Sequence, residues 1–214
     1  MEFISWLTIH TETLAPNTKS VFDTLSQNYA VIDNFYLSGG TALALHLGHR
    51  ESEDLDFFAQ NEFNSQLLQT KLEKITNLAD ISLDSGILNC YSNDVKLQLL
   101  HYPYDLFETP TIFQNIKLSS VIDIACTKLI TISARGSKKD FLDLFYILQE
   151  YSLTELFGLL PKKYSQTDYN LLHLLKSLVF FEDAENQPNP KMHKQISWEA
   201  AKRYITNAVK NFKI

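Results

Sequence analysis

The chain has 214 residues and a mass of 24.6 kDa, with 45% hydrophobic and 21% charged residues. This composition is that of a folded globular protein, and it excludes disordered, collagen-like and repeat architectures. The net charge of −6 excludes a uniformly basic chain, and two cysteines, Cys90 and Cys126, are too few for a disulfide framework. Because we find no signal-peptide pattern and no apolar run long enough to span a bilayer, we expect a cytoplasmic protein without a membrane partner.

The first sixty residues predict alternating helices and strands. Pro16 suits the first position of a helix, because its missing N–H is not needed there, and Gly48 suits a left-handed C-cap. A polar turn after Gly48 leads into a segment where carboxylates alternate with apolar residues, which is typical of a strand. The predicted elements are a helix from Pro16 to near Tyr29, a strand over 35–37, a helix over 41–47 and a strand over 54–58.

The middle of the chain predicts one amphipathic helix followed by strands. Four apolar side chains recur at helical spacing over residues 64–78, and we expect them on one buried face: Leu67, Leu68, Leu72 and Ile75. Three short β-like runs follow over 81–83, 87–91 and 95–100, with the turn signal Asn93–Asp94 between the last two.

From Ser119 onward the chain predicts helices. Ser119 or Ser120 can cap a helix, and Ser137 with Asp140 fits the capping box that opens the next one. The predicted helices run up to Arg135, from Ser137 to about Tyr151, near 168–182 and near 198–212. We therefore predict an α/β (α+β) fold, with a small mixed sheet flanked by helices over 1–115 and a C-terminal helical region over 116–214 that completes the active site.

Asp54 and Asp56 are the first candidate site residues. Side chains at positions i and i+2 of a strand point to the same face, so these two carboxylates should lie side by side. Two ionised carboxylates held close together repel each other unless a cation neutralises them. Mg²⁺ suits this position, because it binds one or two carboxylates and keeps other coordination sites for water and phosphate oxygens.

A glycine-rich turn precedes these carboxylates. Gly39, Gly40 and Thr41 end a strand and open a helix, and their peptide N–H groups would form an anion pocket for a polyphosphate. Alone, this triplet is more often a turn with an N-cap, and an Asp-x-Asp pair alone is common at exposed strand ends. In one strand–turn–helix–turn–strand unit, together with Arg50 and Ser52, they predict a phosphoryl-transfer site.

Other catalytic motifs do not fit this segment. No Gly-Lys-Ser/Thr follows the glycines, which excludes a P-loop. A phosphatase with an aspartyl nucleophile would have an apolar strand before its first aspartate, whereas residues 50–53 are polar. The six histidines are scattered along the chain and are expected in the core or on the surface rather than as ligands.

The predicted helices carry a second group of candidates. Lys128 and Arg135 are seven residues apart, so they share a helix face and can point at one anion. Asp140 and Asp143 share a face of the next helix in the same way. The structural alternative is that Asp140 only completes the capping box and that Lys139 pairs with Asp143 at i, i+4.

Positive charge gathers at the end of the chain. Residues 191–214 contain five Lys and one Arg against Glu199, which gives this segment a net charge of +5. Because the whole chain has a net charge of −6, the other 190 residues carry −11. Such a helix fits a phosphate-contacting arm, and it equally fits a solvated helix at a chain end.

Two segments together resemble the AbiEii toxin family of minimal nucleotidyltransferases. The first comprises the run Leu37 to Ala44 with the segment His49 to Phe57, and the second comprises Lys128, Arg135 and the run Lys139 to Leu144. The resemblance implies a nucleotidyltransferase fold, an NTP with Mg²⁺ as the donor, and an AbiE-type toxin–antitoxin pair with an AbiEi-like antitoxin. Some relatives transfer nucleotides to the acceptor end of tRNA, so tRNA or another RNA is the implied acceptor.

The resemblance also implies a role for each matching residue. Asp54 and Asp56 would hold the metal, and Lys128 would reach the phosphates. Asp140 or Asp143 would orient or deprotonate the attacking hydroxyl, or help to hold the nucleotide. The nucleotide-binding set is Gly39, Gly40, Thr41, Arg50, Ser52, Arg135 and Asp143.

One position departs from the pattern of many nucleotidyltransferases. These enzymes place a third carboxylate on the strand beside Asp-x-Asp, where this chain has Gln98 as the nearest match. A helical aspartate, Asp94 or Asp105 could replace it, or catalysis is weakened. The alternatives to an RNA-modifying toxin are therefore a catalytically weak nucleotide-binding protein that acts through a protein partner, and a transferase that modifies a small molecule.

Overall fold

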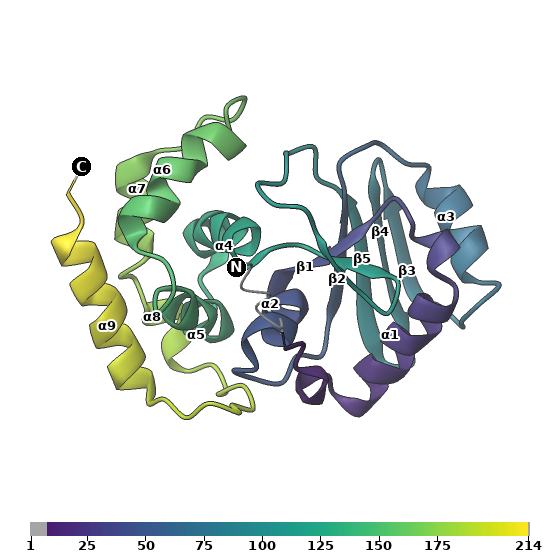
Figure 1. The fold of residues 1–214 in the computed structure, drawn as a ribbon, viewed down its shortest axis with the longest axis horizontal. Helices are drawn as coiled ribbons and strands as arrows, with labels where there is room; N and C mark the ends of the chain where they lie inside the picture. Colours follow the sequence, from purple (N-terminus) through teal and green to yellow (C-terminus); the bar gives the residue numbers. More distant parts are fainter. Residues whose placement is uncertain (1–7, 214) are drawn as a thin grey trace, which may run out of the picture.

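The computed structural model describes residues 8–213 as a sheet packed on a helical half (Figure 1). The strands are β1 (Tyr36–Ser38), β2 (Leu55–Ala59), β3 (Ala79–Asp84), β4 (Ile87–Ser92), β5 (Val95–His101), β6 (Thr111–Phe113) and β7 (Ile116–Leu118). The α-helices are α1 (Pro16–Gln27), α2 (Gly39–Leu47), α3 (Ser65–Leu72), α4 (Val121–Arg135), α5 (Lys138–Ile147), α6 (Leu153–Lys163), α7 (Leu171–Ser177), α8 (Glu182–Glu185) and α9 (Trp198–Asn211). Two 3₁₀ turns, Thr11–Thr13 and Tyr29–Val31, flank α1.

The seven strands of the described chain form one mixed sheet in the order β3-β4-β5-β2-β1-β7-β6. β2 pairs antiparallel with β1 and parallel with β5, and β1 pairs parallel with β7. The register places Asp56 between Ser38 on β1 and Gln98 on β5. A carboxylate therefore lies in the middle of the sheet.

Different helices cover the two faces of this sheet. α1 and α3 lie against one face, and α2 and α4 lie against the other (Figure 1). Side chains alternate along a strand, so the fully buried row Leu37, Phe57 and Leu99 faces α1 while Asp56 and Gln98 face α4. The remaining helices pack beyond α4, with α9 on the far side of α5 (Figure 1).

Local sequence signals correctly predicted several element ends. Pro16 opens α1, Gly48 is the left-handed C-cap of α2, and Ser137 forms a complete capping box with Asp140. Asn93 and Asp94 both have positive φ in the β4–β5 turn, as the hairpin signal predicts.

Other predictions about the fold were wrong. The helix expected over 64–78 ends at Leu72, and Leu67 is 55% exposed rather than buried, because only one narrow stripe of α3 faces the sheet. The helix expected near 168–182 is divided into α7 and α8, and α6 with its internal Pro161 was not expected. The β6–β7 hairpin was also missed, and β7, which ends at Leu118, belongs to the sheet.

In the part of the chain that the structure describes, no helix has the length and apolar character needed to cross a membrane.

Candidate active site

A cavity of about 420 Å³ lies between the sheet and α4. Its floor consists of side chains from β2 and β5, its roof comes from α4, and its end walls are the start of α2 and the start of α5. Nine of the expected site residues line it: Gly39, Gly40, Thr41, Arg50, Ser52, Asp54, Asp56, Lys128 and Arg135, and Asp140 is a tenth. Asp143 is not among the lining residues.

The two carboxylates of the Asp-x-Asp pair face this cavity together. Asp56 is largely buried, and burial followed by the nearby Asp54 charge raises the pKa of its carboxyl above the ordinary value. Asp54 is more exposed and forms an ion pair at 3.3 Å with Lys139 of α5. Within residues 8–213, no hydrogen bond or ion pair reaches the Asp56 carboxylate. The Asp56 carboxyl group therefore has no protein partner of its own among the described residues.

The start of α2 points at the same cavity. The N-cap residue Ser38 does not cap the helix, because its hydroxyl accepts a hydrogen bond from Ser119 at 2.9 Å. The first N–H groups of α2 therefore have no side-chain acceptor, which is the arrangement of an anion-binding helix terminus. Thr41 holds the neighbouring turn, because its hydroxyl contacts the Ser52 hydroxyl at 2.8 Å and the Asp54 carbonyl oxygen.

The glycines of this turn are needed for close approach. Gly39 has φ of +63°, and a Cβ there would lie 2.6 Å from the Asp56 Oδ2 atom. A Cβ on Gly40 would collide with the Arg50 guanidinium. Any larger residue at either position would displace a charged group of the cavity.

A buried cluster of charges joins the sheet half to the helical half. The Arg50 guanidinium donates to both carboxylate oxygens of Asp143 on α5, from Nε at 2.7 Å and from Nη2 at 2.9 Å. Lys128 on α4 lies 2.6 Å from Asp143 and 2.7 Å from Asp140. His49 Nε2 completes the cluster at 2.8 Å from Asp143. We call Arg50, His49, Lys128, Asp140 and Asp143 the buried charge cluster.

The charges of this cluster shift the pKa values of its members. Burial alone would raise the pKa of Asp143, but Arg50 and Lys128 outweigh it and hold that pKa well below the ordinary value. Burial likewise opposes ionisation of Asp140, yet Lys128 keeps its pKa low. Burial lowers the pKa of His49, so a neutral imidazole donates from Nε2 to Asp143. Arg50 and Lys128 balance two carboxylates, and the cluster is neutral overall.

The contacts of the cluster bear on four of the sequence candidates. Arg50, Lys128, Asp140 and Asp143 all have protein partners, and Asp140 also accepts from the Ser137 hydroxyl of its capping box at 2.5 Å. The alternative in which Lys139 pairs with Asp143 is wrong, because Asp143 bonds within the cluster and Lys139 pairs with Asp54.

Two basic residues of the cavity were not singled out as site residues from the sequence. Lys96 lies two positions before Gln98 on β5 and so shares its face, and Lys139 opens α5 beside Asp54. Period-2 alternation around Gln98 was the signal that could have identified Lys96. Arg135, which is exposed at the end of α4, adds a third cation to the rim.

The position beside Asp56 holds an amide. Gln98 pairs in register with Asp56, as the sequence suggested, and its Nε2 donates to Asn89 on β4 at 2.7 Å. Neither Asp94 nor Asp105 lines the cavity. Among the described residues, no group of three or more His, Cys, Asp or Glu side chains is placed to hold a metal ion. The donor set at the cavity is thus two carboxylates, which suits a hard cation that keeps ligands from water or phosphate.

Comparisons with known proteins agree with this geometry. Residues 24–92, which contain the glycine turn and both aspartates, match the family described as nucleotidyl transferase AbiEii toxin, type IV TA system. The protein aq_aa25 of Aquifex aeolicus is 34% identical over 190 residues, which cover 85% of this chain and 89% of that protein. The chain belongs to the AbiEii nucleotidyltransferase toxin family.

Solved structures show the same fold as this AbiEii family member. JHP933 from Helicobacter pylori has a TM-score of 0.53 at 17% identity, with 94% of this chain and 89% of that chain covered. MenT4, a nucleotidyltransferase toxin from Mycobacterium tuberculosis H37Rv, has a TM-score of 0.55 at 12% identity, with 95% and 88% covered. The predicted nucleotidyltransferase-like fold is thereby confirmed.

The raised pKa of Asp56 predicts that Asp56→Asn leaves this AbiEii protein as stable as the natural chain or more stable at neutral pH. A folded-state pKa above the unfolded value means that ionising Asp56 opposes folding as pH rises through the folded pKa. The advantage of Asn is therefore full above that pKa and vanishes as pH falls to about 4, the ordinary aspartate pKa. Urea unfolding at several pH values measures it, with Asp33→Asn on the surface as the control. A loss of stability at pH 7 would contradict the assignment.

Proposed function

We propose that this protein transfers a nucleotide from an NTP to an RNA acceptor, with tRNA as the foremost candidate, in an Mg²⁺-dependent reaction. It would act as the toxin partner of an AbiEi-like antitoxin. The observation that carries the proposal is one cavity in which an uncapped helix start adjoins the Asp54–Asp56 carboxylate pair and three cations. The helix start and the cations suit a polyphosphate, and the carboxylate pair suits the metal ion bound to it.

Different groups of the chain would bind different parts of an Mg²⁺·NTP. Asp54 and Asp56 would hold the ion, which neutralises phosphate charge as the P–O bond breaks. The N–H groups at the start of α2 would donate hydrogen bonds to oxygens of the outer phosphates. Lys139, which is now paired with Asp54, is 49% exposed at its side chain and can turn to the phosphates when a stronger cation replaces it. Lys96 and Arg135 would neutralise the remaining charge from the rim.

In the transfer itself, a hydroxyl of the acceptor attacks the α-phosphorus, one O–P bond forms, and the bond between the α- and β-phosphates breaks to release pyrophosphate. The helical carboxylates are poor bases for the hydroxyl proton, because Lys128 and Arg50 hold the pKa values of Asp140 and Asp143 low. We assign the proton to water in the cavity. The buried charge cluster then has a positioning role, since it fixes α4 and α5 over the sheet.

A second candidate function rests on Gln98. An amide beside Asp56 cannot accept the hydroxyl proton, which favours a nucleotide-binding protein that transfers slowly and acts through a protein partner. Transfer of radiolabel from each of the four NTPs to total tRNA separates the two functions.

We expect Asp54→Asn and Asp56→Asn each to reduce transfer by at least about 10²-fold, because the metal supplies several kcal/mol of charge stabilisation. Both variants should remain folded, and Asp33→Asn should transfer normally. The measurement is the initial rate of NTP-dependent labelling at several Mg²⁺ concentrations. Full activity in either cavity variant would exclude that carboxylate from the site.

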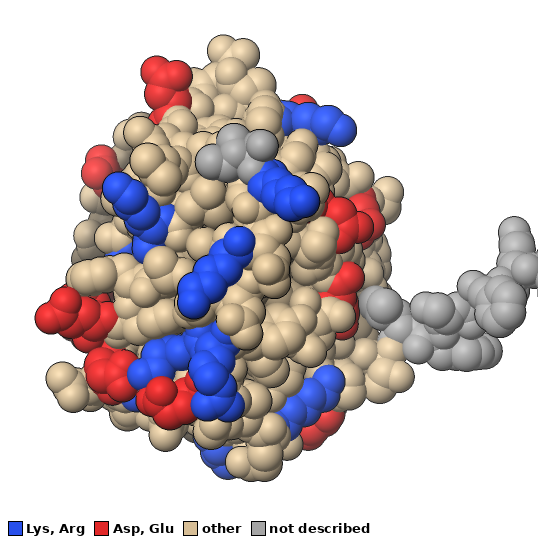
Figure 2. All heavy atoms as spheres, turned by 90° about the vertical axis from the view of Figure 1, so that its left-hand side faces the viewer, with Lys and Arg blue, Asp and Glu red and all other residues tan. Residues whose placement is uncertain are grey.

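RNA binding is assigned to the exposed face of α9. Figure 2 looks onto this side of the molecule, where several Lys and Arg side chains lie across the middle. Ala201 and Ile205 anchor α9 in the core, while Arg203, Lys210 and Lys213 are exposed. Lys202 is less available, because it pairs with Glu185 at 3.0 Å and Glu199 at 2.8 Å.

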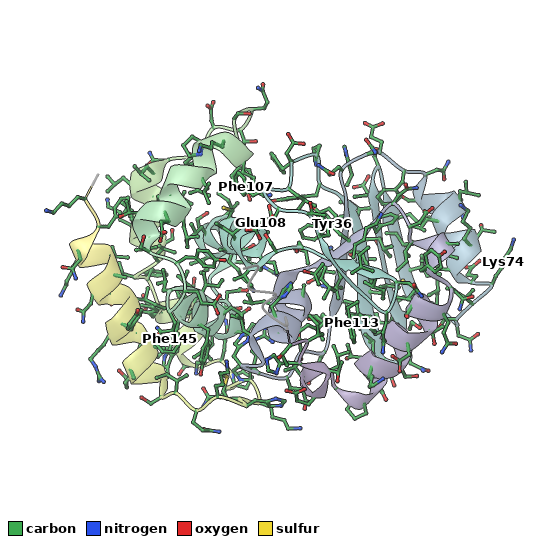
Figure 3. All side chains as sticks on the ribbon, viewed as in Figure 1. Tyr36, Lys74, Phe107, Glu108, Phe113 and Phe145 are labelled. Atoms are coloured by element: carbon green, nitrogen blue, oxygen red, sulfur yellow. The ribbon has the colours of Figure 1, made fainter. Side chains whose placement is uncertain are left out.

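Charge reversal tests this face. We expect Arg203→Glu with Lys210→Glu to weaken tRNA binding, because two phosphate contacts are lost. The slope of the logarithm of the binding constant against the logarithm of the salt concentration should become less steep by about two. NTP binding should not change. The matched control is Lys71→Glu with Lys74→Glu, since Lys74 lies at the opposite end of the molecule from α9 (Figure 3). Filter binding at several salt concentrations measures both, and equal effects of the two pairs would refute a specific role for α9.

A further inference from the structure

A second cavity, of about 570 Å³, adjoins the candidate active site. Tyr102, Thr127, Thr131 and Arg135 line both cavities, so the two are separated only by shared side chains. The second cavity extends from the end of β5, along α4, to the segment between α6 and α7. Its volume is within the range of small-molecule sites in proteins, about 300–1,000 Å³.

Aromatic rings dominate the wall of this cavity. Tyr102, Tyr104, Tyr164 and Tyr169 all line it, and we call it the tyrosine cavity. Tyr104 packs edge-on against Tyr102 at 4.7 Å and against Tyr164 at 4.8 Å between ring centroids. The hydroxyls bond to one another or to threonines: Tyr102 to Tyr164 at 2.6 Å, and Tyr104 to Thr167 at 2.9 Å. The hydroxyls of three of these four tyrosines are thus engaged with protein.

A buried ion pair makes this wall rigid. Lys163, the residue before Tyr164, lies 2.7 Å from Asp123 on α4 and donates to the carbonyl of Asp105 at 2.8 Å. The Asp123 carboxylate also accepts the N–H of Phe107, which lies between the sheet and the helical half (Figure 3). The loop after β5 and the end of α6 are therefore tied to the same point of α4, and the tyrosines that they carry are held in place without a ligand.

Another cavity beside the active site has a different character. It measures about 530 Å³ and is lined by charged residues, prolines and amides of the 187–191 loop, with no aromatic ring among the described residues that line it. Of the two cavities that adjoin the active site, the tyrosine cavity is therefore the one that offers stacking partners to a flat, uncharged ring. That cavity also offers Asn170, His173 and Ser133 for hydrogen bonds to a ring edge, and Arg135 at its entrance for a phosphate.

We infer that the tyrosine cavity binds a nucleobase while the attached phosphate lies at the Asp54–Asp56 site. The inference rests on the proposed function, because it takes the phosphate position from it. Stacking on tyrosine tolerates any base, and the polar groups at the ring edge would select among bases. The base belongs either to the donor NTP or to the terminal nucleotide of the acceptor RNA, and the two sources are distinguished by experiment.

Tyr104→Ala and Tyr169→Ala test the donor source. If the cavity takes the NTP base, each variant binds Mg²⁺·NTP about 5- to 150-fold more weakly, the loss expected for one stacking ring. Binding of inorganic tripolyphosphate, which has no base, stays unchanged. Tyr104→Phe keeps the ring and should bind NTP normally, and Tyr29→Ala, an exposed tyrosine before β1, is the control for a general loss of a ring. Equilibrium dialysis measures the affinity of each variant and of the natural chain for both ligands.

The acceptor source uses the same variants with a short single-stranded RNA. If the cavity takes the acceptor base, RNA binding falls by a similar factor while NTP binding is unchanged. If neither NTP nor RNA binding changes in two folded alanine variants, the inference is overturned. Failure of this inference can be told apart from failure of the proposed function. If the natural chain transfers no label, but Tyr104→Ala weakens base-dependent binding, only the proposed function is refuted. If the natural chain transfers label, but Tyr104→Ala and Tyr169→Ala bind NTP and RNA normally, only the inference about the tyrosine cavity is refuted.

Discussion

The bidentate ion pair between Arg50 and Asp143 is the contact on which the arrangement of this molecule depends. It joins the turn before β2 to α5 across 93 residues of sequence, with both groups almost fully buried. A buried ion pair adds little net stability compared with apolar residues of the same volume, but removing one partner costs about 3–5 kcal/mol. Its effect is geometric, because a planar guanidinium and a carboxylate fit in few orientations. The pair therefore fixes how far α5 lies from the carboxylates of β2.

The same constraint divides the charges of the site into two groups. The buried cluster is neutral and its members bond to each other, so it holds the walls of the cavity and has little capacity left for a ligand. The rim cations Lys96, Lys139 and Arg135 are more exposed and can reorient toward phosphate. Asp54 and Asp56 lie between the two groups, and within the described residues the Asp56 carboxylate forms no ion pair, which leaves it available to a cation.

The sequence predicted the parts of this site that depend on local pattern. The glycine turn, the spacing of Asp54 and Asp56, and the Ser137 capping box each involve residues within a few positions, and each is found in the structure. The partners of Arg50 and Lys128 could not be read in the same way, because spacing along the chain does not reveal which distant carboxylate a buried cation meets. Lys128 lies on a largely apolar helix, and that pattern does not identify the two aspartates that it meets.

Tertiary context also determined the elements that were missed. β6 and β7 have three residues each and Ile112 is 67% exposed, so their alternation is too short to recognise. They are strands because β7 pairs with β1 and β6 pairs with β7. α6 accommodates Pro161 in its last turn. The tyrosine cavity draws side chains from the loop after β5, from α4 and from the α6–α7 segment, which only the packed fold brings together.

A double-mutant cycle on Arg50 and Asp143 tests the central claim most directly. Arg50→Met, Asp143→Leu and the double variant are compared by urea unfolding and by Mg²⁺·NTP binding. The account predicts that each single change costs about 3–5 kcal/mol, because it leaves a buried charge unpaired, and that the double change costs clearly less than their sum. NTP affinity should fall in all three variants, since the cavity walls lose their fixed spacing. Additive losses of stability, or an unchanged NTP affinity in the folded double variant, would contradict it.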